Sequence, residues 1–124
     1  MRAKDALLRL ARMSGTFALF RALNRRRILV LTYHRFTGAP CPGRTSASNL
    51  AAQLDYLASH YTVLPLSTVE SRLREGRPLP LATAAITIDD GYSDFYEIAW
   101  PVFRRRKMPA TVFVVSGEPC MLTR

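Results

Sequence analysis

The sequence is poor in acidic residues, in cysteine and in long apolar stretches. Among its 124 residues, 18 are Lys or Arg and 9 are Asp or Glu, so the formal net charge is +9. The two cysteines, Cys41 and Cys120, are far apart and show no C-x-x-C spacing, which excludes a zinc ribbon and a dithiol redox motif. A single disulfide between them remains open. The longest stretch without a charged side chain, residues 56–69, has 14 residues, whereas a membrane-spanning helix needs about 18 to 20 apolar ones.

The positive charge is concentrated at the N-terminus. Residues 1–27 contain eight basic residues and one acidic residue, whereas the remaining 97 residues have a net charge of only +2. A basic stripe across the whole folded surface is therefore not expected, and this argues against nucleic acid as a partner. Apolar residues recur at near-helical spacing between these basic residues, with a break expected at Ser14 and Gly15. We predict a basic amphipathic helical segment over residues 1–27.

Two uses of this N-terminal segment fit its pattern. An apolar helix stripe more often packs on the rest of its own protein, and we favour that use. The alternative is contact with an anionic membrane surface, where each Lys or Arg contributes about 1 kcal/mol. A cleavable signal peptide is not expected, because the uncharged residues 13–20 are few and are followed by Arg21 and by three arginines at residues 25–27. These features favour a cytoplasmic or membrane-peripheral location.

From residue 28 onward the sequence alternates between strand and helix patterns. Four short apolar runs predict strands, which span residues 28–33, 61–64, 84–88 and 110–115. Strands separated by helices are joined by crossovers, so we expect them to be parallel. Because each run is continuously apolar, we expect both faces of the strands to be covered. The predicted fold class is α/β.

Helix signals lie between these strands. Leucines at i, i+4 and i+7 predict a helix with its N-cap at Ser46 or Ser48. Ser67 and Glu70 have the spacing of a capping box at the start of the next helix. In the third helix, Pro101 either introduces a kink or marks the true first turn.

Polar residues follow the first and third predicted strands. His34 comes directly after the first, and Asp89 and Asp90 come directly after the third. Because the carboxyl ends of parallel strands meet at one edge, we expect these side chains to lie close together. Adjacent carboxylates repel, which suits a metal ligand beside a general base, and Gly91 allows the sharp turn that would present both. A plain Asp-Gly turn also fits, with Asp90 or Asp94 as a helix cap and His34 as a hydrogen-bonded core histidine.

The residues around this turn resemble a known family. The sequence Thr-Ile-Asp-Asp-Gly-Tyr at residues 87–92 resembles the Thr-Phe-Asp-Asp-Gly motif of the polysaccharide deacetylase (NodB homology) family. In that family a helix and a Pro-Ala-Thr-x-Phe-Val strand follow, and residues 109–114 match that strand. Residues 31–34 also resemble a Leu-x-Tyr-His segment that precedes many such domains. The resemblance extends over residues 28–117, with Ile88 in place of the motif's Phe.

The resemblance implies a metal-dependent hydrolase of carbon–nitrogen bonds on a distorted α/β barrel. Its substrate would be an acetylated polysaccharide, such as one of the cell envelope, from which it removes N-acetyl or O-acetyl groups. By position in the motif, Asp89 would be the general base and Asp90 a ligand of a divalent metal, usually zinc. His34 would be a rim residue near the site.

One part of the family pattern does not occur in this sequence. The second motif, His-Ser/Thr-x-x-His-Pro, supplies two further metal ligands in the family and is absent from these 124 residues. We therefore expect residues 28–124 to be the truncated N-terminal half of such a domain, a partial barrel, with the activity of this chain alone left open. A non-catalytic alternative is a membrane-peripheral or binding remnant that uses residues 1–27 and retains the aspartate pair as a relic.

Overall fold

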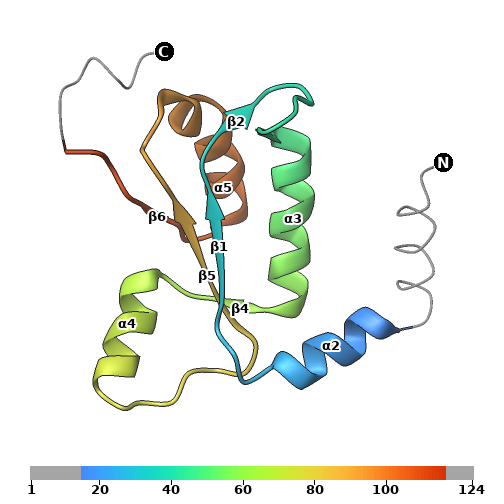
Figure 1. Cartoon of the computed structure of the whole chain (residues 1–124), viewed down its shortest axis with the longest axis vertical. Helices are drawn as coiled ribbons and strands as arrows, with labels where there is room; N and C mark the ends of the chain where they lie inside the picture. Colours follow the sequence, from blue (N-terminus) through green and yellow to red (C-terminus); the bar gives the residue numbers. More distant parts are fainter. Residues whose placement is uncertain (1–14, 117–124) are drawn as a thin grey trace.

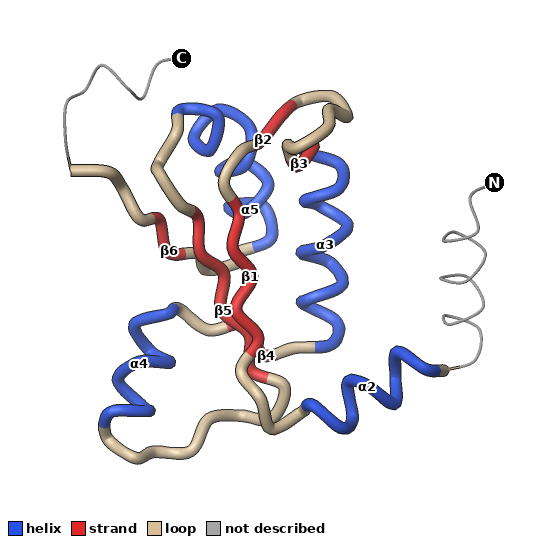
Figure 2. Tube along the Cα trace, in the orientation of Figure 1, coloured by secondary structure: helices blue, strands red, loops and turns tan. Residues whose placement is uncertain are grey.

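The computed structural model describes residues 15–116, and its centre is a small parallel β-sheet (Figures 1 and 2). The central strand is β5 (Thr83–Ile88), which pairs along one edge with β1 (Leu29–Tyr33). On its other edge, β4 (Thr62–Val63) pairs with its beginning and β6 (Thr111–Val112) with its end. The predicted α/β fold with parallel strands is confirmed. Over the described residues the sheet is open and no barrel closes.

Helices follow the strands in the predicted alternation. The helical elements are α2 (Thr16–Asn24), α3 (Ala47–His60), α4 (Leu66–Arg74), the π-helical turn η1 (Phe95–Ala99) and α5 (Trp100–Arg106). A short parallel ladder, which the sequence pattern did not reveal, pairs β2 (Phe36–Thr37) with β3 (Thr45–Ser46). Residues from α3 and α5 form one hydrophobic core with β1 and β5, while α4 contacts β5 near the start of the sheet.

The prediction for α3 is confirmed at both its cap and its buried face. The Ser46 hydroxyl accepts a hydrogen bond of 3.2 Å from the backbone N–H of Asn49, which satisfies one of the free donors at the helix start. Leu50, Leu54 and Leu57 are buried, as their spacing requires. They pack in the core with the alternate β5 residues Ala84, Ile86 and Ile88.

The prediction that both faces of the strands are covered is correct for β5 and wrong for β1. All six β5 residues are buried, whereas β1 buries only Tyr33 and leaves Leu29 and Val30 exposed. β1 lies at the edge of the described sheet, and its Thr32 shares a face with Thr87 of β5, to which it is hydrogen-bonded at 2.9 Å. That face is turned away from α3 and α5. β1 is therefore apolar in composition although the described residues leave most of it uncovered.

The fourth strand is also shorter than predicted. Only Thr111 and Val112 form β6, although the apolar run extends over residues 110–115. Phe113, Val114 and Val115 are exposed and lie beyond the last residue pair of the ladder, although the backbone N–H of Phe113 still donates a 2.8 Å hydrogen bond to the carbonyl of Ile88. Apolar composition alone therefore overestimated the paired length.

The capping box predicted at Ser67 and Glu70 is wrong. α4 begins at Leu66 with Pro65 at its N-cap, and no side chain caps it. Ser67 therefore lies inside the first turn instead of before it, and the Glu70 carboxylate pairs with Arg74 one turn further on. Proline at the cap fixes the backbone entry, so the hydroxyl cap is not used.

Pro101 marks a first turn, which was one of its two predicted roles. It lies in the opening turn of α5, directly after η1. Proline has no N–H to donate into a preceding turn, and the wide π-helical turn accommodates this position. The basic residues Arg104, Arg105 and Arg106 then occupy the last turn, where positive charge complements the helix dipole.

The described part of the N-terminal segment does not bury an apolar stripe as favoured. Residues 1–14 lie outside the described residues, so the predicted helix can be compared only from Gly15, which precedes α2. α2 buries no residue, so the apolar side of this helix does not serve the core. Within the part of the chain that the structure describes, no helix is long and apolar enough to cross a bilayer.

Candidate active site

The register between β1 and β5 brings His34 and Asp89 together. Tyr33 lies opposite Ile88 in the ladder, so the next residue of each strand emerges at the same edge. The backbone N–H of Asp89 extends the ladder by donating a 2.9 Å hydrogen bond to the carbonyl of Tyr33. Beyond it, the Nε2 atom of His34 lies 3.3 Å from the Oδ2 atom of Asp89. The predicted convergence of these two side chains is confirmed.

Asp90 and Gly91 form a tight turn immediately after this pair. Their φ angles are +68° and +64°, a left-handed conformation that aspartate tolerates better than most residues and glycine adopts freely. The N–H of Gly91 donates a 2.9 Å hydrogen bond back to the carbonyl of Asp89. The side chain of Asp90 forms no hydrogen bond or ion pair with any residue in the range 15–116, and it is only partly buried. Its carboxylate is therefore available to a ligand.

An ion pair links the two loops that carry these residues. The Nε atom of Arg35 donates a 2.7 Å hydrogen bond to Oδ2 of Asp94, and the guanidinium lies over the Tyr92 ring, 4.1 Å from its centroid. The neighbouring Asp94 carboxylate raises the pKa of Arg35 above its ordinary value. Asp94 is buried, which is favourable only for a paired charge. Its predicted alternative role as a helix cap is wrong, because it makes no side-chain cap bond at η1.

Tyr33 anchors the base of the site from inside the core. Its hydroxyl donates a 2.8 Å hydrogen bond to Oε1 of Gln53 on α3. Burial raises the pKa of the Tyr33 phenol, so this group stays neutral. The residue therefore fixes the end of β1 against α3, and it does not face the His34 and Asp89 pair.

The second histidine of the chain lies outside this site. His60 is at the C-terminal end of α3, where its Nδ1 atom is 2.9 Å from the carbonyl oxygen of Tyr56 and its ring stacks on the Tyr56 ring. His60 therefore lies away from the aspartates. Parallel strands place their carboxyl ends at the opposite end of the sheet from the C-terminus of α3, which leads back to the start of β4.

The described residues do not complete a metal site. Among residues 15–116 there is no group of three or more His, Cys, Asp or Glu side chains that could hold an ion. A zinc site requires at least three protein ligands, and here His34 is engaged with Asp89 instead of turning to Asp90. Asp90 can thus be one ligand at most. The described residues alone therefore support no metal-dependent chemical step.

The fold and the site together define a class. The molecule is an α/β protein with a carboxylate–imidazole pair at the carboxyl edge of a parallel sheet, which is where enzymes of this fold class place their catalytic groups. Residues 76–120 match the profile of the polysaccharide deacetylase family. The chain is thus similar to the polysaccharide deacetylase (NodB) family, and it spans less than half the length of the solved deacetylase structures that it matches.

Relatives and solved structures show the same similarity. The chain is 34% identical over 68 residues to the poly-beta-1,6-N-acetyl-D-glucosamine N-deacetylase of Escherichia coli. These aligned residues are 54% of this chain and 10% of that protein. It is similar to the structure of IcaB from Ammonifex degensii, with a TM-score of 0.66, 33% identity and coverage of 73% of this chain and 39% of that one. The Streptococcus pyogenes deacetylase PplD, at 23% identity and a TM-score of 0.63, shares the fold over 73% of this chain and 43% of its own.

Sequence reasoning predicted the residues of the candidate site better than it predicted the contacts that hold them in place. The partner of Arg35, Asp94, is 59 positions away in the sequence. The one signal in the sequence was the presence of a basic residue directly after His34 and an acidic residue shortly after Asp90. Because either residue could have faced solvent, the pairing was not predictable from the sequence.

Proposed function

We propose that residues 28–124 form the N-terminal half of a NodB-type domain that removes acetyl groups from a carbohydrate polymer, with residues 1–27 as a separate basic segment. The observation that carries this proposal is the approach of His34 to Asp89 at the carboxyl ends of β1 and β5. The match to a poly-N-acetylglucosamine N-deacetylase favours the amide of an N-acetyl group over an ester. We take an acetylated polysaccharide of the cell envelope as the substrate class.

Asp89 would act as the general base in this reaction. Neutral water is a poor nucleophile toward an amide, and a carboxylate within reach can remove its proton as it attacks. The His34 side chain is more than half exposed, so it can face both Asp89 and an incoming substrate. We assign to His34 the handling of the proton next to the base, because its Nε2 atom lies 3.3 Å from the Asp89 carboxylate.

Asp90 would provide one ligand of a divalent metal, with zinc as our expectation. A bound metal would polarise the acetyl carbonyl and favour ionisation of a water molecule. The unpartnered carboxylate of Asp90 fits this role, whereas the other ligands would have to come from residues outside the described range. Asp89 pairs with His34, whereas Asp90 lies in the left-handed turn without a partner among residues 15–116, so the adjacent acids can serve different purposes.

A chimera tests the proposal despite the partial coverage of the relatives. The matching part of the Ammonifex degensii protein is replaced by residues 28–116 of this chain, and acetate release from poly-β-1,6-N-acetylglucosamine oligomers is measured with zinc present. We expect a folded, active chimera whose rate falls by at least about 100-fold with Asp89→Asn, because general base catalysis contributes about that much or more. His34→Gln should also reduce the rate, and Asp90→Asn should reduce both the rate and zinc retention.

The matched control is Asp55→Asn, which removes a carboxylate from the surface of α3 and should leave the rate unchanged. Circular dichroism establishes that each variant is folded. A folded chimera without deacetylase activity contradicts the proposal, as does full activity in the Asp89→Asn variant.

A further inference from the structure

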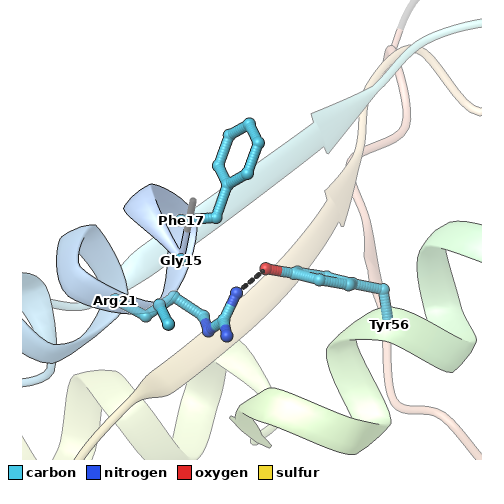
Figure 3. A pocket seen from close by; sticks show the side chains of 5 residues that line it. Gly15, Phe17, Arg21 and Tyr56 are labelled. Atoms are coloured by element: carbon cyan, nitrogen blue, oxygen red, sulfur yellow. Dashed lines mark hydrogen bonds between the residues drawn. The ribbon is translucent and has the colours of Figure 1, made fainter. Parts of the chain in front are cut away.

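The end of the molecule remote from the candidate site exposes apolar side chains on α2. Leu19, Phe20 and Leu23 are 60%, 59% and 71% exposed. At 100° per residue, both leucines lie on the side of the helix opposite to Arg21. Arg21 holds α2 to the body, because its Nη1 donates a 2.7 Å hydrogen bond to the hydroxyl of Tyr56 on α3 (Figure 3). The helix is thus attached through Arg21, and it turns Leu19 and Leu23 outward.

Unpaired arginines adjoin this apolar side. Arg25, Arg26 and Arg27 follow α2 directly and are exposed, and none of them forms an ion pair with a carboxylate of residues 15–116. The carbonyl of Arg25 accepts a 2.6 Å hydrogen bond from the N–H of Ala82, which ties this segment to the chain that leads into β5. The neighbouring Leu81 is also exposed. We call the surface made by α2, residues 25–27 and Leu81 the basic end.

We propose that the basic end docks peripherally on an anionic lipid bilayer. A bilayer interface accepts apolar side chains into the acyl boundary while its anionic headgroups meet the arginines, so it satisfies both features of the surface at once. Nucleic acid would neutralise the arginines but leave Leu19 and Leu23 in water. The described part of α2 carries no acidic residue that would oppose an anionic surface.

This docking sets the orientation of the candidate site. The strands run from the basic end to the site edge, and β5 has six residues that each advance the chain by roughly 3.3 Å, which separates the two ends by about 20 Å (Figure 1). The edge with His34 and Asp89 would face away from the bilayer, toward material outside its surface. The docking does not depend on the deacetylase activity, since the two surfaces share no residue.

Vesicle co-sedimentation of the full chain tests the proposal. We expect binding to vesicles of phosphatidylcholine mixed with phosphatidylglycerol, weakened by added salt, and little binding to phosphatidylcholine alone. Replacing Arg25, Arg26 and Arg27 together by Gln should lower the partition coefficient on the order of 100-fold. The double variant Leu19→Gln and Leu23→Gln should lower it by about 10-fold or more, because two apolar side chains no longer enter the interface.

Matched controls remove the same groups from other surfaces. The first changes three basic residues of the α5 end to Gln, Arg104, Arg105 and Lys107, and should retain binding to the anionic vesicles. The second changes the exposed apolar residues Tyr96 and Val115 to Gln and should also retain it. Circular dichroism verifies that all variants are folded, which is expected because every changed side chain is exposed.

Several results would overturn the proposal. One is a lack of binding to anionic vesicles at low salt, and another is an equal loss in the control variants. Dimerisation that the Leu19→Gln and Leu23→Gln variant abolishes, without vesicle binding, would assign the surface to a second copy of the chain. Binding that appears only after deletion of residues 1–14 would assign it to the chain's own N-terminal segment. Preference for an oligonucleotide over the vesicles would assign it to nucleic acid.

Discussion

The Nε atom of Arg35 and the Oδ2 atom of Asp94 are 2.7 Å apart. This contact links the two loops that carry His34 and Asp89. Arg35 directly follows His34, and Asp94 is the last residue before η1. The pair therefore lies just outside the site and connects β1 with the helical segment after β5. The orientation of the two candidate catalytic side chains depends on backbone that this pair restrains.

We predict that Arg35→Gln destabilises the protein more than Arg44→Gln. Arg35 bonds Asp94 directly, whereas the Nη1 atom of Arg44 is 4.0 Å from the same carboxylate and its side chain is more exposed. Without Arg35, the buried charge of Asp94 loses its main partner, and such a charge is costly. Adding Asp94→Asn to Arg35→Gln should recover part of the loss. Urea midpoints of the variants measure this, and equal midpoints for the two arginine variants would contradict it.

Gly91→Ala should destabilise the protein for two separable reasons. A left-handed backbone costs an L-residue about 1 to 2 kcal/mol, and a Cβ at Gly91 would lie 2.8 Å from Cγ1 of Val114. Gly76 has a φ of +66° with open space around it, so Gly76→Ala measures the backbone cost alone. We expect a larger loss of unfolding free energy at Gly91 and partial recovery on adding Val114→Ala. If the two glycine variants lose the same free energy, the contact with Val114 does not matter.

Ile86→Ala should cost about 2 to 5 kcal/mol of unfolding free energy, because Ile86 is fully buried in β5 and its truncation leaves a cavity. Val30→Ala in the adjacent strand should cost less than about 1 kcal/mol, since half of that side chain is exposed and mainly strand propensity is lost. Chemical denaturation of both variants tests the difference in burial between the paired strands. A cost at Val30 equal to that at Ile86 would show that β1 is covered in solution.

The ion pair between α3 and α5 should make stability fall at acid pH. Nε and Nη2 of Arg106 donate hydrogen bonds of 2.7 and 2.9 Å to the two carboxylate oxygens of Asp55, which lowers the pKa of that carboxyl. A lowered folded-state pKa gives stability that is present above the ordinary aspartate value, about 4, and is lost as the pH falls through the folded value. Asp55→Asn should flatten this part of the acid dependence of the urea midpoint. An unchanged acid slope in the variant would exclude the pair as its cause.

Much of the fold and the position of the candidate site could be predicted from the sequence alone. Local patterns were enough for α3, because a cap at Ser46 and leucines one turn apart act within a few residues. They were also enough for the approach of His34 to Asp89, since residues that follow parallel strands emerge at one edge whenever those strands are paired in register. Local reasoning failed at Ser67, where a proline one residue before the helix determined how it begins.

Tertiary structure alone decided which surfaces are covered and which charges are paired. An apolar run shows that a strand favours burial, but only the placement of β1 at the sheet edge leaves Val30 exposed. The helical pattern of α2 could not show that its apolar side turns away from the body. The partner of Arg35 lies 59 positions along the chain, at a distance set by the packing of β1, β5 and η1 together. Periodicity and capping depend on neighbours in sequence, whereas exposure and ion pairing depend on neighbours in space.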